Sequence, residues 1–139
     1  MFTKLTFVAA IFLVSETAFA QSELPTADRN GDYSRRTSHT KWIVVDSDPN
    51  GVNCRWSKDM PDNWYAPDSK WVELNIREWP VVRRFKKNSP SQKLTANITP
   101  AGFATIRDDS GKPWLKVSIG PNDQICLVRA NESLIRPVK

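Results

Sequence analysis

Histidine, cysteine and glycine are scarce in this 139-residue chain, which has one, two and five of them respectively. The single histidine, His39, has no second histidine, cysteine or carboxylate at a metal-ligand spacing, so a zinc site and histidine-based catalysis are disfavoured. The few glycines form neither a phosphate-binding loop nor a nucleophile elbow. We therefore predict that the protein is not an enzyme and holds no cofactor.

Candidate groups for other chemistry are also incomplete. Carboxylates are paired at 46–48 and at 108–109, but both pairs lie in predicted turns, where aspartate is favoured because it bonds to nearby main chain. The segment 46–50 has oxygen ligands suited to calcium but lacks the downstream glutamate of a calcium loop. Cys54 as a nucleophile would need a histidine base, and His39 lies in a predicted flexible leader. We predict no catalytic residue and no metal.

Long apolar runs are missing except at the N-terminus. There, Lys4 precedes an apolar run at 5–14, and Ala18-Phe19-Ala20 has the small residues of a cleavage site. The run is shorter than the about twenty residues that span a bilayer, so we predict a signal peptide at 1–20, no membrane span after its cleavage, and a secreted or periplasmic protein. The alternative is a buried N-terminal element of a cytosolic protein.

The remaining residues, 21–139, amount to one domain. Their net charge stays at +5, because Lys4 and Glu16 both lie in the removed segment. Such an excess favours anionic surfaces such as wall polymers, lipid headgroups or nucleic acid. A basic stripe interleaved with aromatics at the spacing of a nucleic-acid module is missing, so we expect no nucleic-acid partner.

The two cysteines, Cys54 and Cys126, are the only intramolecular pair that can form a disulfide in an oxidising compartment. Closing a loop of this length would stabilise the domain by about 4 kcal/mol. The alternative is two separate buried thiols.

Residues 21–40 are polar and predict a flexible leader. After it, β-branched and aromatic segments recur about every ten residues with turn signals between them, which is typical of a small antiparallel barrel or sandwich. A single 3₁₀ turn is expected at 130–133. The expected strands are 42–45, 52–56, 81–87, 92–98, 103–107, 113–119, 124–129 and 134–138.

The segment 56–79 interrupts this rhythm with aromatics among prolines and aspartates. Part of it, 69–78, fits a strand or one or two helical turns, and we favour the strand. Aromatic rings beside polar groups suit a proline-rich peptide, a glycan face or a protein partner. The alternative is a satellite core under a long loop. The candidate ligand-binding residues are Asn53, Arg55, Trp56, Trp64, Tyr65 and Trp71.

Four cations lie in the five residues 83–87. Such a run is typical of a solvated edge strand protected against sheet-to-sheet association, and we favour that interpretation over an anion-binding site.

Three short motifs resemble those of the bacterial SH3-like (SH3b-type) domain family, and they occur along the chain in the same order as in the family. Val52-Asn53-Cys54-Arg55 is similar to the family's leucine-asparagine-valine-arginine strand, 80–87 resembles its proline-valine-isoleucine segment running into cations, and Trp114-Leu115-Lys116-Val117 resembles its tryptophan-lysine-valine strand. Here the aromatic segment replaces a short glycine-rich loop, and Ile125-Cys126-Leu127-Val128 replaces a glycine-tryptophan-valine strand.

The resemblance implies an all-β fold, a small SH3-like antiparallel barrel of five to six strands over 41–139, with 56–79 as an insertion and a 3₁₀ turn near the C-terminus. It would let Cys54 and Cys126 meet. It also implies a non-catalytic module that binds cell-wall peptide or glycan, or a partner protein. The alternative is a structural or self-assembly protein that associates through an aromatic patch.

Overall fold

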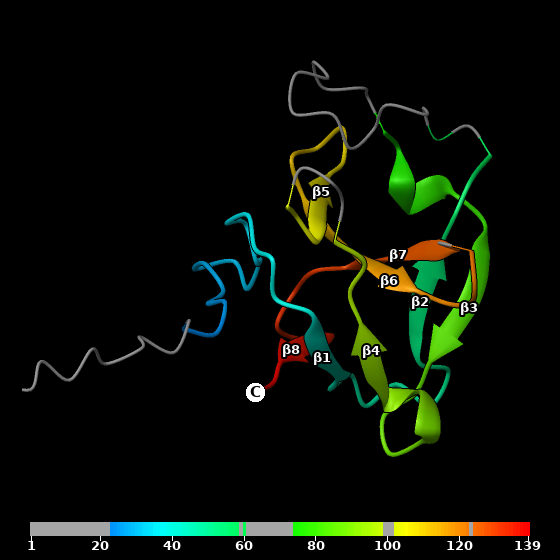
Figure 1. Cartoon of the computed structure of the whole chain (residues 1–139), viewed down its shortest axis with the longest axis horizontal. Coiled ribbons are helices and arrows are strands. Elements are labelled where there is room, and N and C mark those ends of the chain that lie inside the picture. Colours follow the sequence, from blue (N-terminus) through cyan, green and yellow to red (C-terminus); the bar gives the residue numbers. More distant parts are fainter. Residues whose placement is uncertain (1–22, 59, 61–73, 99–101, 123) are drawn as a thin grey trace, which may run out of the picture.

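The computed structural model describes residues 23–58, 60, 74–98, 102–122 and 124–139. Over these residues the protein is all-β, as predicted, with eight strands in two antiparallel sheets and two short 3₁₀ helices (Figure 1). The eight strands correspond to the eight expected from the residue pattern, whereas the SH3-like resemblance implied five to six. In this part of the chain no helix is long and apolar enough to cross a membrane.

The smaller sheet has β1 (Lys41–Val44) at its centre, between β4 (Lys93–Thr95) and β8 (Ile135–Pro137). Period-two alternation turns Trp42 and Val44 of β1 toward the core, where both are buried. The indole N–H of Trp42 donates to the carbonyl of His39 at 2.9 Å, so the buried ring keeps its hydrogen bond.

The larger sheet has the strand order β3-β2-β7-β6-β5. The predicted hairpin at its far side is confirmed, because β5 and β6 pair in antiparallel register around a turn that begins at Asp108. The strand bounds are Val81–Phe85 for β3, Val52–Arg55 for β2, Ile125–Arg129 for β7, Pro113–Ser118 for β6 and Thr105–Arg107 for β5.

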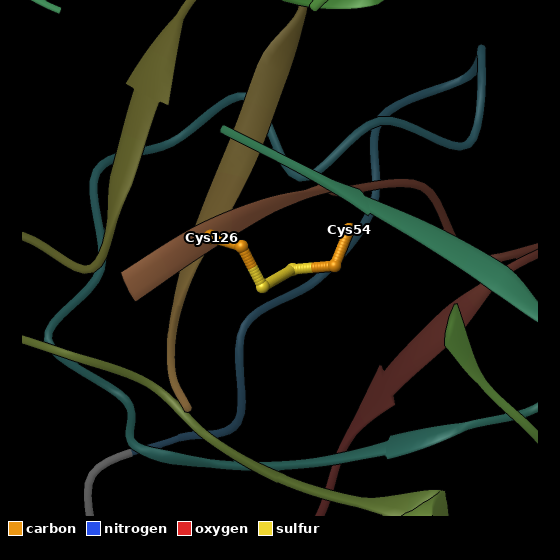
Figure 2. Close-up of a disulfide and its surroundings, with 2 residues drawn as sticks. All are labelled: Cys54 and Cys126. Carbon is orange, nitrogen blue, oxygen red and sulfur yellow. A yellow bond between two sulfur atoms is a disulfide. The ribbon is translucent and has the colours of Figure 1, made fainter. Parts of the chain in front are cut away.

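The two sheets enclose the main hydrophobic core. An isolated bridge between Ala96 and Val117 connects the end of β4 to β6, where β5 has already stopped. Cys54 of β2 and Cys126 of β7 lie in this core, both without exposed surface, and form a disulfide with a Cα–Cα distance of 5.4 Å (Figure 2). The predicted pairing is confirmed.

The larger sheet is covered on its other face as well. Trp114 of β6 and Leu127 of β7 point away from the main core and are buried in a second hydrophobic cluster. The other buried members of that cluster, Met60, Leu74, Ile76 and Trp79, all come from the predicted insertion. Strand β6 is therefore buried on both faces, and simple alternation of inner and solvated side chains does not hold there.

Three local expectations need correction. The favoured strand at 69–78 is replaced, in its described part, by a 3₁₀ helix η1 (Ile76–Glu78), which is nearer to the alternative of one or two helical turns. A second 3₁₀ helix, η2 (Pro90–Gln92), begins at a proline and was not predicted. The expected 3₁₀ turn near the C-terminus is a hydrogen-bonded turn in which Asn131 accepts from the amides of Leu134 and Ile135.

Residues 23–40 make specific contacts with the domain, which corrects the expected flexible leader. Tyr33 is 4% exposed, packs edge-on against Trp42 with ring centroids 5.0 Å apart, and its hydroxyl donates to the Ile135 carbonyl. Asp32 pairs with Asn131 in a β-bridge and accepts a hydrogen bond from Arg129 at 2.5 Å. One large aromatic side chain and paired polar groups thus order a segment whose average composition is polar.

Candidate functional site

The outer face of strands β2 and β3 brings together a predicted ligand residue and a cation. Asn53 and Arg84 are register partners, and the Arg84 Nε donates to the Asn53 Oδ1 at 3.2 Å. Val52 and Cys54 point the other way and are buried, so alternation fixes which residues of β2 face outward. Asn53 therefore lies at the surface and positions a guanidinium on the neighbouring strand.

Arg55, also a predicted ligand residue, is half-buried and anchors the main chain. Its NH1 group donates to the Trp79 carbonyl at 2.7 Å, and the next amide, of Trp56, donates to the Pro80 carbonyl at 3.1 Å. The pairing of β2 with β3 shifts register between Cys54 and Arg55. Arg55 thus fixes the point where the insertion returns to the sheet.

The aromatic side chains of the insertion that the structure describes pack against the hydrophobic clusters and are not fully exposed to solvent. Trp56 is half-buried and contacts both hydrophobic clusters, and Trp79 is buried with its indole N–H donating to Asn75 Oδ1 at 3.1 Å. These two rings fit the satellite-core alternative. The other predicted ligand residues, Trp64, Tyr65 and Trp71, lie outside the described residues.

Strand β3 carries the strongest local charge of the described surface. We call Arg83, Arg84, Lys86 and Lys87 the cationic edge. All four are exposed, and β3 ends the five-stranded sheet, so the predicted edge position is confirmed. At the same margin Val82 is 46% exposed, and it is the single exposed large apolar side chain among the described residues.

The acids nearest in sequence to β2 do not neutralise this edge. Asp46 accepts from the amide of Asp48, and Asp48 accepts from the amide of Asn50, so both carboxylates stabilise the turn before β2. The two ion pairs found over the described ranges, Arg77 with Asp109 and Arg129 with Asp32, involve none of the four cations. The cationic edge therefore presents its charge to solvent.

Lys116 is a buried lysine that sequence reasoning did not single out. It is 1% exposed on β6, its Nζ donates to the Phe103 carbonyl, and burial lowers its pKa from 10.5 to about 7. Its register partner is Leu127 of the second cluster. The signal that could have found it is its position in a strand between apolar residues, since Pro113, Trp114 and Leu115 precede it and Val117 follows it.

Asp108 and His39 have structural roles. The Asp108 carboxylate accepts from the amides of Ser110 and Lys112 and from the Trp114 indole at 2.9 Å, which confirms that this aspartate bonds within its turn. His39 was expected in a flexible leader, but its Nε2 bonds the Val138 carbonyl at 2.7 Å and its ring lies against Trp42. Over the described ranges no group of three or more metal-binding side chains occurs.

Comparison of the chain with protein-family models, with curated proteins and with solved structures found no match.

Proposed function

We propose that this protein is an exported, non-catalytic binding module that recognises an anionic partner through the cationic edge of β3. The observation that carries the proposal is the exposure of Arg83 and Arg84 on an edge strand and of Lys86 and Lys87 directly after it, with no acid paired to them over the described residues. The net charge of +5 adds a weaker attraction of the same sign at longer range.

The expected partner carries repeated negative charge. One exposed ion pair contributes at most about 1 kcal/mol, so binding that matters in salt requires several cations to act together. The four cations lie within five consecutive residues. The main-chain distance between neighbouring cations of this run is therefore shorter than the Debye length of about 8 Å at physiological salt. An anionic cell-wall polymer and an acidic stretch of protein both meet this requirement, and both fit a periplasmic or secreted protein.

Export is supported by the signal-peptide pattern of residues 1–20 together with the buried disulfide, which forms in oxidising compartments. An SH3-like barrel is supported by the bridge from Ala96 to Val117, which joins the end of β4 in the smaller sheet to β6 in the larger one.

The test is retention on anionic matrices. The exported protein, with its disulfide formed, is applied to immobilised poly-glutamate and to purified cell-wall sacculi, beside Arg83→Glu/Arg84→Glu. The matched control is Lys93→Glu/Arg136→Glu, which changes the same charge at exposed positions of the smaller sheet. We expect the edge variant to lose retention and the control to keep most of it. Equal retention of the two variants contradicts the proposal.

Self-assembly through an aromatic patch is the second candidate. The described rings Trp56 and Trp79 pack within the molecule, which does not favour it. Sedimentation over a range of concentrations separates the two candidates, because a strictly monomeric protein excludes self-assembly.

A further inference from the structure

Strand β3 is bound on one side only within the described part of the chain. Its single neighbour is β2, paired in antiparallel register. An edge strand of this kind presents a row of main-chain N–H and C=O groups away from its neighbour, which can pair with another extended chain. In Figure 1 β3 lies at the right-hand margin of the molecule.

The cations flank this row from both sides. Consecutive side chains of a strand point to opposite faces of the sheet, so Arg83 and Arg84 lie on opposite sides of the edge. The register agrees, because Arg84 is opposite the outward Asn53 and Arg83 is opposite the inward Cys54. A polymer lying on one face of the sheet would meet one of the two guanidinium groups, whereas a chain added edge-on meets both.

From this arrangement we propose that β3 takes up an extended acidic segment of another polypeptide as an added strand. The main-chain groups of β3 would hold the segment, Arg83 and Arg84 would pair with acidic side chains on its two faces, and the exposed Val82 would contact an apolar one. The inference rests on the proposed function, since both use the cationic edge.

A second copy of this chain is a poor occupant of the same edge. Two β3 strands laid side by side would bring the arginines of one beside the cations of the other, and like charges on neighbouring strands are destabilising. The charge that excludes another copy favours an acidic strand. The occupant is therefore a polypeptide of different sequence with acidic side chains close together.

The experiment uses three probes against the ¹⁵N-labelled, disulfide-bonded protein. The first is a capped peptide in which pairs of glutamates alternate with pairs of valines, so that both faces of the extended peptide carry acids, about eight residues long so that it exceeds a typical strand. The second is the same peptide with N-methyl groups on its central amides, which keeps the charge and removes main-chain donors. The third is polyphosphate, which has charge but no peptide groups.

We expect the first peptide to bind, with amide exchange within 82–85 slowed at least about tenfold, and the N-methylated peptide to bind at least about tenfold more weakly. Polyphosphate should shift resonances of the cationic edge without slowing exchange there. Arg83→Glu/Arg84→Glu should lose the first peptide and gain the same peptide with lysine in place of each glutamate, whereas Lys93→Glu/Arg136→Glu should behave as the wild type.

The outcomes separate the inference from the proposed function. If the two peptides bind alike, or if polyphosphate slows the same amides, the edge binds anions without adding a strand; that result overturns the inference and leaves the proposed function standing. If neither the peptides nor polyphosphate binds at the edge, both are overturned.

Discussion

Gly51 lies directly against the main chain of Phe85, where the turn before β2 meets the end of β3. A Cβ built on Gly51 would lie 2.6 Å from the Phe85 carbonyl oxygen, and Gly51 has a φ of +77°. Only glycine satisfies both conditions without displacing backbone. This contact fixes the turn at 48–51 against the strand that carries the cationic edge.

Gly51→Ala should therefore lower the free energy of unfolding by about 2–4 kcal/mol, because strain in φ and a backbone clash add together. Gly111→Ala is the matched control: its φ is +75°, but nothing lies within 4 Å of the added Cβ, so about 1 kcal/mol is expected. Urea unfolding followed by tryptophan fluorescence measures both. Equal losses would show that the approach to Phe85 has no energetic effect.

Replacing Asp108 tests the turn that holds Trp114. Asp108→Ala leaves two amides and the indole N–H without their acceptor in a site that is 5% exposed, and should cost about 2–3 kcal/mol of stability. Asp108→Asn retains one oxygen for the two amides and should cost less. Chemical denaturation ranks the stabilities of the wild type and the two variants. An asparagine variant less stable than the alanine variant would contradict the role of Asp108 as the acceptor of these hydrogen bonds.

Lys116 should make stability depend on alkaline pH. Its pKa is about 7 in the folded protein and 10.5 when unfolded, so the unfolded chain binds more protons between these values. The penalty for burying the charge is complete below pH 7 and falls as pH rises, so stability should increase by at most about 1.4 kcal/mol per pH unit.

The measurement for Lys116 is urea unfolding between pH 7 and 9, compared with Lys116→Met, which keeps an unbranched side chain of similar length. The free energy of unfolding of Lys116→Met should not increase with pH over this range. Parallel curves for the two proteins would show that another group causes any pH dependence.

The disulfide should stabilise the domain strongly. Cys54 and Cys126 close a loop of 72 residues, for which the loss of chain entropy in the unfolded state is worth about 4 kcal/mol. We expect Cys54→Ala/Cys126→Ala to be less stable by that order, although β2 and β7 still pair. A variant with the stability of the wild type would contradict an entropic role for this bond.

The strands near Asn53 and Cys126 could be predicted because alternation and turn residues act locally. The apolar neighbours of Lys116 indicate a buried strand, but the residues that cover the outer face of β6, such as Leu74 and Ile76, fold back from the insertion, which no local pattern indicates. Tyr33 shows the same limit: a polar segment is ordered by one ring that enters a distant core. The predicted ligand residues Arg55 and Trp56 are near the edge but serve the packing of the insertion.

Chemical-shift mapping with poly-glutamate tests the central claim most directly. We predict that the amides most perturbed lie in 81–87 and at Asn53, and that the shifts weaken as sodium chloride rises from about 0.05 to 0.5 M. Shifts centred on the insertion at 56–79, or spread evenly over the basic surface, would contradict the assignment of recognition to the cationic edge.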